Sequence, residues 1–494
     1  MVPDAFCFPP GAMAPAATRV SAALYAAPAA AGLLPYTTAL DALIRDYPPP
    51  AHQRWRPRGL GVTRAWPMRR LAATFRYPRW AGDVLVVGEC RRAAEVAMMA
   101  RLVEAIVRSG RTVLYVSGNR GEHAAMRARH RAAGWSAACA LACVPTAEYD
   151  RRQYWLHRDA PWQARRDWRQ LEPLLAAQGA YLHRDADWAL RETATGKVQW
   201  RLLAPRLRFD AAVVRATSPP LSAAILADCF ASGRLSVSLQ HSVVTCPSSF
   251  APLLARRYLC YGTHSRALLA ELDAQLAAAS QRPPTGCEII PCGPFHDPVP
   301  GVRPSRESAS LVIIDQTSAW APRYYGGAAQ FDALQQIVPR LAASSAVRRV
   351  VVRLHPSGGQ PRAWDEVAAR HPDRVVLSRD RLLEADLQGA SAVVGLFSTV
   401  LPAATAAAIP TFFLWQPGWY HTPDLQPFAA TQFASPDDVV PRVEALLCDE
   451  TRFASECASS RAAAAAYYAG GGVGDFDAEM AQILRPLSDR PRTA

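Results

Sequence analysis

The stretch DVLVVGECRRAAEVAMMARLVEAIVRSGRTVLYVSGN, residues 83–119, holds two short apolar runs on either side of a longer segment with apolar residues at helical spacing. Continuous apolar runs are typical of strands that are buried on both faces of a sheet. Gly110 ends the helical segment, because glycine readily adopts the left-handed conformation that closes a helix. A strand, a helix and a strand at this spacing predict two parallel strands joined by a crossover helix.

The same alternation continues to residue 300 and predicts one doubly wound domain over residues 83–300. The interval 148–208 interrupts it, since that interval is charged, rich in Trp and poorly periodic. We expect this interval to cover the sheet as helices and a loop. The further strands of the domain are predicted in the apolar runs at 136–145, 209–217, 235–242, 255–262 and 287–294.

A second doubly wound domain is predicted over residues 308–450. It follows the segment DPVPGVRPSRESAS (297–310), which is polar, rich in Pro and Ser, and typical of a linker. Residues 1–82 form a Pro/Arg-rich N-terminal extension, and residues 451–494 are expected to form C-terminal helices and a tail. Two Rossmann-like domains that face each other across a cleft are the layout of the α/β architecture called GT-B. The strands of the second domain are predicted at 311–318, 347–357, 373–378, 390–398 and 409–415.

Length and composition favour a cytoplasmic protein of more than one domain. With 494 residues, half of them apolar, the chain can bury two sizeable cores. No apolar run approaches the roughly 20 residues that cross a bilayer, and the N-terminus lacks the basic start and unbroken apolar core of a signal peptide. The eleven cysteines form no CxxC pair, as expected of thiols in a reducing compartment rather than of a disulfide framework or a zinc site.

The net charge of +13 is weak evidence for a polyanionic partner, because it follows a general bias toward Arg in a chain with a single lysine, Lys197. No nucleic-acid-binding motif is present, so we expect no nucleic-acid partner. Residues 47–82 contain no acidic residue and alternate Arg with Trp, Phe and Tyr. This segment has two interpretations: peripheral contact with the anionic surface of the inner membrane, or a solvated lead-in that packs on the first domain.

Three predicted strands of the second domain end in polar residues that suit phosphate binding. Open parallel sheets bind ligands beyond the carboxyl ends of their strands, where helix N-termini favour anions. Ser398 and Thr399 offer hydroxyls at such a position, although a helix N-cap uses the same residue types. His355 can hydrogen-bond a phosphate and, when protonated, neutralise the charge of a leaving group. The other candidates at these strand ends are Arg353, Ser357, Thr317 and Ser318.

In the first domain, the strand predicted at 235–242 ends at Gln240 and His241. If the two sheets face each other, His241 lies on the wall opposite the phosphate candidates. That position suits a general base that takes a proton from an acceptor hydroxyl. The alternative is a histidine that is hydrogen-bonded within a loop. No dense cluster of Asp and Glu indicates a catalytic metal, and we expect neither a metal nor a cofactor.

Taken in order, the segments QHS, IIPCGPFHD (289–297), RLHPS and GLFSTVLPAATAAAIPTFFL resemble bacterial GT-B transferases that build surface polymers. This group includes the CDP-glycerol-type teichoic acid polymerases and the capsular polysialyltransferases. The resemblance covers residues 235–414. It implies that His355 contacts the donor phosphate, that Ser398 and Thr399 bind it, and that His241 is the base.

The chain departs from that pattern at Ser242, where the family usually has Gly, and at Pro402 and Ala403, where an acidic residue followed by Ala is common. The expected function is transfer of a sugar or polyol phosphate from a nucleotide-activated, cytidine-type donor to a polysaccharide or lipid-linked acceptor. Two alternatives stay open. One is a nucleotide-sugar epimerase, with Asp297 and Asp315 as carboxylates for proton transfer. The other is a non-catalytic GT-B-like subunit of a capsule assembly complex.

Overall fold

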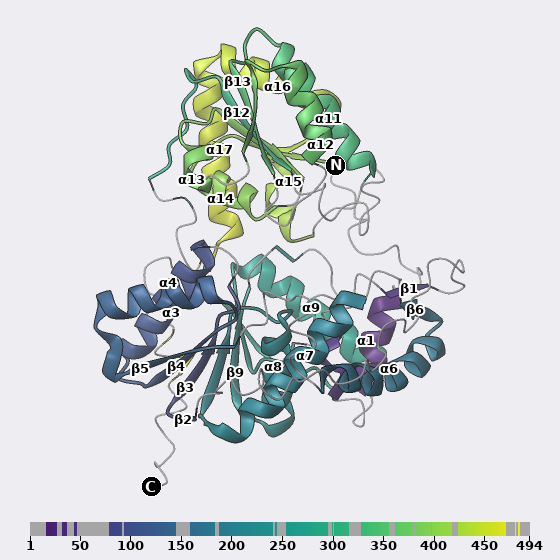
Figure 1. Cartoon of the computed structure of the whole chain (residues 1–494). Helices are drawn as coiled ribbons and strands as arrows, with labels where there is room; N and C mark the ends of the chain where they lie inside the picture. Colours follow the sequence, from purple (N-terminus) through teal and green to yellow (C-terminus); the bar gives the residue numbers. More distant parts are fainter. Residues whose placement is uncertain are drawn as a thin grey trace.

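The computed structural model has two α/β domains, one above the other in Figure 1. In the described residues, no helix combines the length and the hydropathy that crossing a bilayer demands. The structure describes residues 16–26, 32–36, 44–46, 79–90, 93–144, 159–182, 187–240, 243–244, 253–294, 299, 301–315, 328–354, 361–378, 382–396, 398–416, 423–470, 480 and 483–484.

The first domain is built on a seven-stranded sheet in which all neighbours are parallel. Across the sheet, the strands are β11 (Glu288–Pro291), β10 (Arg257–Cys260), β9 (Leu235–Leu239), β8 (Ala211–Val214), β3 (Val84–Val87), β4 (Val113–Ser117) and β5 (Cys139–Cys143). From β3 the chain winds outward through β4 and β5, and it then adds β8 and its successors on the other side. This reversal creates a turning point between β3 and β8, where open α/β sheets bind their ligands.

The side chains of β3 alternate between two buried clusters. Its even-numbered residues pack with α3 (Ala93–Arg108), and its odd-numbered residues pack in the cluster that contains α8 (Pro220–Ser232). Because successive strand residues point to opposite faces, α3 and α8 cover opposite faces of the sheet. Two further helices, α4 (Arg120–Ala133) and α9 (Thr263–Ser280), follow β4 and β10. The first sheet is therefore doubly wound, as the sequence predicts.

The second domain repeats the plan with six parallel strands. Across the sheet they are β14 (Val375–Ser378), β13 (Arg349–Leu354), β12 (Ser310–Asp315), β15 (Ala392–Gly395), β16 (Thr411–Leu414) and β17 (Phe433–Ala434). The chain starts at β12 and later reverses to β15, so the second turning point lies between these two strands. The surrounding helices are α11 (Ala328–Ala343), α12 (Pro361–Arg370), α13 (Leu383–Leu387), α14 (Val400–Ala406), η7 (Pro423–Phe428), α16 (Pro436–Cys448) and α17 (Glu450–Tyr467).

The described part of the N-terminal extension packs on the first domain. Its elements α1 (Ala16–Ala26) and β1 (Ile44–Asp46) contact α6 (Ala160–Ala177) and β6 (Ala180–Leu182), and α7 (Asp187–Leu203) lies beside α6. Lys197 of α7 donates to Asp167 Oδ2 at 2.7 Å and to Gly32 O at 2.5 Å, and Tyr36 OH donates to the same carboxylate oxygen at 2.7 Å. Residues 47–78 lie outside the described residues, so both interpretations of the Arg-rich segment stay predictions.

The end of the chain returns to the first domain. Tyr467 of α17 is buried in the core of the second domain, whereas Met480, Ile483 and Leu484 are buried with α3 in the core of the first. The segment predicted as a linker also contributes to a core, because Val302 is buried in the second domain. The chain thus passes between the domains twice.

Candidate functional site

The strands that precede the phosphate candidates are neighbours in the second sheet. The order β13-β12-β15 is parallel throughout, so the carboxyl ends of these three strands lie along one edge. Arg353 belongs to β13, and Ser398 and Thr399 follow β15 by a few residues. Four further candidates follow β12 or β13 in sequence but lie outside the described residues: Thr317, Ser318, His355 and Ser357.

Ser398 caps the short helix α14. The Ser398 hydroxyl oxygen accepts a hydrogen bond from Val400 N at 3.2 Å, and the Ser398 carbonyl accepts one from Leu401 N at 3.0 Å. Thr399 stands at the N-cap position with helical backbone angles, and its side chain makes no capping hydrogen bond. Ser398 therefore stands one position before the N-cap and satisfies the first main-chain amide of the helix. A phosphate contact by either hydroxyl stays a prediction.

Helix α14 is packed closely where the resemblance leads one to expect an acidic residue. Pro402 and Ala403 are both buried, and α14 packs along α17. A carboxylate at either position would have to leave water, which costs several kcal/mol unless a partner compensates. The departure from the family pattern therefore agrees with the packing of this helix.

Arg353 is paired with a buried acid. Its guanidinium contacts Asp386 of α13, whose side chain is fully buried, and the Ser378 hydroxyl donates to the same carboxylate oxygen at 2.6 Å. The pairing satisfies a carboxylate that would otherwise be costly to bury. Part of the positive charge that the sequence assigns to phosphate binding is therefore neutralised by the protein itself.

Asp315 is the last residue of β12, and its carboxylate also has a hydrogen-bond partner within the protein. Its Oδ2 accepts a hydrogen bond from Trp364 Nε1 at 2.7 Å, and both side chains are buried. Trp364 lies on α12, so this bond fixes the helix against the end of the strand. Asp297, the other carboxylate considered for proton transfer, lies outside the described residues.

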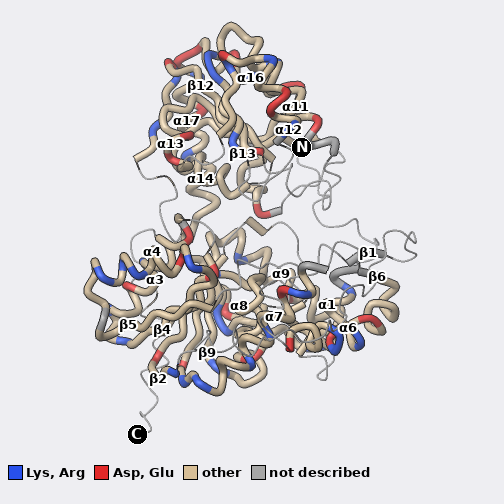
Figure 2. Tube along the Cα trace, in the orientation of Figure 1, with Lys and Arg blue, Asp and Glu red and all other residues tan. Residues whose placement is uncertain are grey.

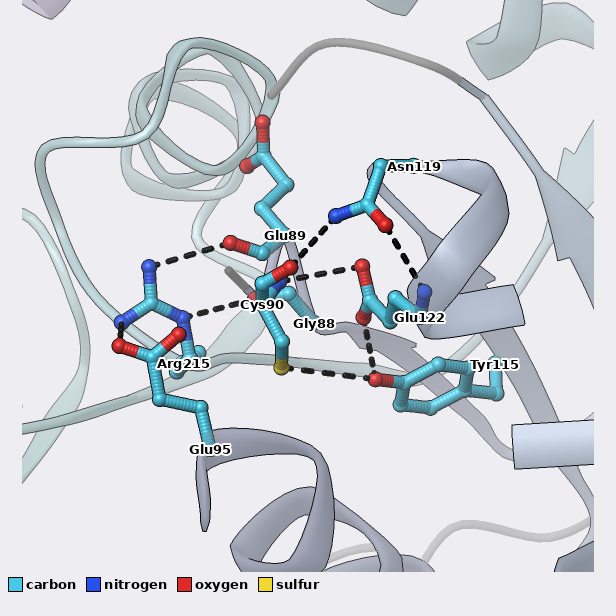
Figure 3. A network of polar contacts seen from close by, with 8 residues as sticks. All are labelled: Gly88, Glu89, Cys90, Glu95, Tyr115, Asn119, Glu122 and Arg215. Carbon is cyan, nitrogen blue, oxygen red and sulfur yellow. Dashed lines mark hydrogen bonds and ion pairs between the residues drawn. The ribbon is translucent and has the colours of Figure 1, made fainter. Parts of the chain in front are cut away.

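The turning point of the first sheet holds a buried polar network, which Figure 3 shows from close by. We call it the Gly88 network: Gly88, Glu89, Cys90, Glu95, Tyr115, Asn119, Glu122 and Arg215. Glu122 of α4 accepts hydrogen bonds from Cys90 N at 3.0 Å, from Gly118 N at 2.7 Å and from Tyr115 OH at 2.5 Å. Burial raises the pKa of the Glu122 carboxyl, and these hydrogen bonds oppose the rise.

The carbonyl oxygens of residues 88–90 also accept hydrogen bonds from side chains of the network. Arg215 donates to Gly88 O at 3.0 Å and to Glu89 O at 3.2 Å, and Asn119 Nδ2 donates to Cys90 O at 2.5 Å. Glu89 adopts a left-handed conformation, with φ of 47°. A non-glycine residue in that region is uncommon, and the surrounding hydrogen bonds hold it there.

The side chain of Glu89 occupies the N-terminus of α8. Its carboxylate accepts hydrogen bonds from Leu221 N at 3.3 Å, from Ser222 N at 2.8 Å and from Ser222 Oγ at 2.6 Å. A helix N-terminus attracts anions through its free amides and its dipole. Here the protein's own carboxylate fills that position. The first sheet therefore does not offer this helix end to a ligand phosphate.

Sequence reasoning missed the Gly88 network for a clear reason. Glu89 and Arg215 each follow a buried strand, which is the signal that identified the candidates of the second domain. Their partners, however, lie far away in the sequence: Ser222 is 133 residues from Glu89. A single polar residue after a strand does not reveal such a partner.

The strand that leads to His241 ends against the second domain. Gln240 follows β9 and is fully buried, and its Nε2 donates to Asp424 Oδ2 of η7 at 3.1 Å. His241 and Ser242 lie outside the described residues. Among the residues that the structure does describe, no group of three or more His, Cys, Asp or Glu side chains is placed to hold a metal ion.

No protein-family model and no curated protein matches this chain. Solved structures do match it. The UDP-GlcNAc 2-epimerase from Neisseria meningitidis bound to UDP-GlcNAc gives a TM-score of 0.51 at 11% identity, over 82% of this chain and 100% of that one. A glycosyltransferase from Rickettsia africae gives 0.47 at 6% identity, over 84% and 100%, and S. aureus MnaA with UDP gives 0.46 at 12%, over 83% and 99%.

The likeness at 11% identity concerns the fold. Together with the two doubly wound parallel sheets, it confirms the predicted class: two Rossmann-like domains in the GT-B arrangement. Glycosyltransferases and sugar-nucleotide epimerases both appear among the structures that match.

Proposed function

We propose that this chain is a GT-B transferase that moves a sugar or polyol phosphate from a nucleotide-activated donor to a surface-polysaccharide or lipid-linked acceptor. The observation that carries the proposal is the adjacency of β12, β13 and β15, whose carboxyl ends share one edge at the turning point of the second sheet. Every phosphate candidate lies at or just after the end of one of these strands in sequence. An anion bound there would meet hydroxyl donors and main-chain amides.

The proposed reaction is a direct displacement. His241 accepts the proton of the acceptor hydroxyl, and the hydroxyl oxygen attacks the donor's reacting carbon or phosphorus as its bond to the nucleotide phosphate breaks. Protein donors then meet the charge that develops on the departing phosphate, so the reaction proceeds without a metal. The residues assigned to that phosphate are His355, Ser357, Ser398, Thr399, Thr317 and Ser318, with Arg353 beside them.

The donor class is tested by nucleotide binding. The UDP-GlcNAc in the matched Neisseria structure supports a nucleotide-sugar ligand, and the resemblance to CDP-glycerol-type enzymes supports a cytidine nucleotide. Purified full-length protein should bind CMP, CDP or UDP with a Kd below about 1 mM, measured by calorimetry and by the rise in Tm. Absence of binding for all three nucleotides contradicts the proposal.

The two histidines are tested by substitution. His241→Ala and His355→Ala should each lower the transfer rate by at least about 100-fold, because each removes a group that acts on the reacting atoms. His371→Ala is the matched control, since His371 lies before the amino end of β14, at the opposite edge of the second sheet. Polymer production that persists with both catalytic candidates replaced would favour a non-catalytic subunit.

We also propose that the protein works in the cytoplasm at the inner membrane, with residues 47–82 against anionic lipid. The charge and aromatic pattern of that segment supports the proposal. The full chain should float with vesicles that contain about 30% phosphatidylglycerol and should detach above about 0.5 M salt, where the Debye length falls toward 3 Å. Equal flotation with neutral vesicles would contradict it.

A nucleotide-sugar epimerase is the second candidate. Glu122 favours it, because a carboxyl with a raised pKa at the carboxyl edge of a sheet is the kind of group that proton transfer requires. It ranks second because Glu122 is buried and already accepts three hydrogen bonds from the protein. Incubation with UDP-GlcNAc in the absence of acceptor separates the two functions, since only an epimerase would isomerise the sugar.

A further inference from the structure

Asp424 lies where the two domains meet, and its side chain is fully buried. Its Oδ2 accepts hydrogen bonds from Gln240 Nε2 at 3.1 Å, from Val244 N at 2.9 Å and from Tyr467 OH at 3.0 Å. Its Oδ1 accepts one from Ser265 Oγ at 2.6 Å. We call these five residues the interdomain joint. One carboxylate thus collects four hydrogen bonds.

The members of the joint come from both domains. Asp424 lies on η7 and Tyr467 ends α17, and both elements pack in the core of the second domain. Gln240 and Val244 follow β9, and Ser265 lies in the first turn of α9, which places these three in the first domain. The carboxylate is therefore a fixed point of one domain to which a loop of the other is attached.

The surrounding contacts keep this attachment close. Thr263 N donates to Ala469 O at 2.9 Å, just beyond the end of α17. A Cβ on Gly262 would lie only 2.1 Å from Tyr467 O, so the turn into α9 needs glycine at this approach. The ring of Tyr261 lies 6.1 Å from that of Tyr467. These contacts leave little room for the two elements to slide past one another.

Asp424 holds the β9 loop on both sides of His241. Gln240 precedes that residue and Val244 follows it by three positions, and both donate to the same oxygen. The Gln240 side chain is held at its other end too, because its Oε1 accepts from Tyr261 N at 2.9 Å. Val243 packs in the core of the second domain, whereas Val244 packs in a cluster of the first.

We propose that Asp424 is a positioning residue that sets the place of the candidate base His241 from the opposite domain. The inference rests on the proposed function, which makes His241 the base. The described residues on either side of His241 in the sequence, Gln240 and Val244, are both anchored to this one carboxylate. The domain that carries the donor-phosphate candidates is thereby attached to the loop to which the candidate base belongs.

Asp424→Asn is a substitution that keeps the shape and removes the negative charge of the joint. All four partners of Asp424 donate to its carboxylate, and hydrogen bonds to a neutral amide oxygen are roughly half as strong as those to a carboxylate. The NH₂ of the new amide can face the Ser265 hydroxyl, which can accept as well as donate. Asp273→Asn is the matched control. Asp273 is a buried aspartate of α9 that accepts from Thr285 N and Thr285 Oγ1 at 3.0 Å, entirely within the first domain. Both carboxyls have a pKa that burial raises.

The first measurement is hydrogen exchange on the full chain, read by mass spectrometry in peptides that cover residues 235–254. Val244 N–H donates to Asp424, so its exchange should become about tenfold faster in Asp424→Asn and should be unchanged in Asp273→Asn. Equal exchange in the two variants overturns the inference, whatever the protein catalyses.

The second measurement is steady-state transfer with the nucleotide donor that the binding tests select. Asp424→Asn should lower kcat at least about tenfold with a donor KM within about threefold of the unsubstituted chain, as expected when a base is misplaced and the donor site is intact. Asp273→Asn should keep kcat even if its Tm falls. A kcat equal to that of the control overturns the inference. If His241→Ala is fully active, it is the proposed base that has failed, which the exchange experiment distinguishes.

Discussion

The two turning points share one topology and differ in what fills them. In the first domain, the Gly88 network ties the loop after β3 to α4, β8 and α8 through buried hydrogen bonds, and Glu89 occupies a helix N-terminus. In the second domain, the strand ends lead to hydroxyl-bearing residues, and one of them, Ser398, caps a helix of seven residues.

The difference shows how a protein can use the same sheet edge in two ways. In the first domain, the protein's own carboxylate fills the anion site. Moving it away would leave buried polar groups without partners, which is costly, so this edge is rigid. Under the proposed function, the hydroxyls and amides at the second edge bind the donor phosphate instead. Figure 2 shows acidic and basic residues distributed over both domains.

The largest expected effect tests whether a candidate residue at the second sheet edge, Arg353, is held by the protein itself. Arg353→Met removes the cation that pairs with Asp386 and should lower the free energy of unfolding by about 4 kcal/mol. The double variant Arg353→Met/Asp386→Leu should recover most of that loss, since it leaves no buried charge unpaired. Urea unfolding measures both. If the double variant also keeps nucleotide affinity, Arg353 is not a phosphate ligand.

The next effect tests how tightly the Gly88 network is packed. A Cβ on Gly88 would lie 1.9 Å from Glu122 Oε1 and 2.0 Å from Tyr115 OH, so Gly88→Ala should destabilise the protein by about 3 kcal/mol. Gly121→Ala on α4 is the control, because the nearest atom to its Cβ would be 3.4 Å away. The control should change stability by less than about 1 kcal/mol. Similar melting curves for the two variants would show that the side chains around Gly88 can move to accommodate the added methyl group.

A smaller effect separates capping from phosphate binding. Ser398→Ala and Ser435→Ala each remove a serine that accepts a hydrogen bond from a main-chain N–H two or three residues ahead, at 3.2 Å. Each should lose about 1 kcal/mol of stability. Only Ser398→Ala should also weaken nucleotide binding, by about tenfold, because only Ser398 lies at the turning point. Equal nucleotide affinities would restrict Ser398 to capping.

The smallest effect is a change of slope with pH. Burial raises the pKa of Glu122 above its ordinary value of 4.5, so the native state holds its proton to higher pH than the unfolded state does. The free energy of unfolding therefore falls as pH rises through the native pKa. Tyr115, Cys90 and Gly118 face this carboxyl, and none of them carries a charge there. Glu122→Gln should flatten the fall above the ordinary carboxyl pKa of 4.5, and an unchanged slope would contradict this account.

The fold was predictable because its signals are local. Runs such as 84–87 and 113–116 are short, apolar throughout and rich in Val, which is typical of a strand buried on both faces. The order of strands and helices then leaves a doubly wound sheet as the natural arrangement. The predicted linker hid Val299 and Val302, because two valines among prolines and serines give no period to detect.

The sequence could nominate site candidates only near the ends of predicted strands. Arg353 lies near the end of β13, and Ser398 and Thr399 follow β15; both strands neighbour β12, and the phosphate contacts of these residues stay predictions. The commitment of Arg353 to Asp386 depends on a contact across 33 residues, and Asp424 reaches Gln240 across 184. Such pairs are set by tertiary packing, and no pattern in the sequence of either partner reports them.

The docking of the N-terminal segment gives the molecule a built-in reporter. Lys197 is the chain's single lysine, and its amine is enclosed by Gly32 O, by Asp167 and by the ring of Tyr36 at 5.2 Å. Burial lowers its pKa, and Asp167 opposes the change. An amine-reactive dye therefore has one side-chain target, and we expect it to react faster when the segment around residue 32 lifts away. The labelling rate of this one side chain would measure how often the extension undocks.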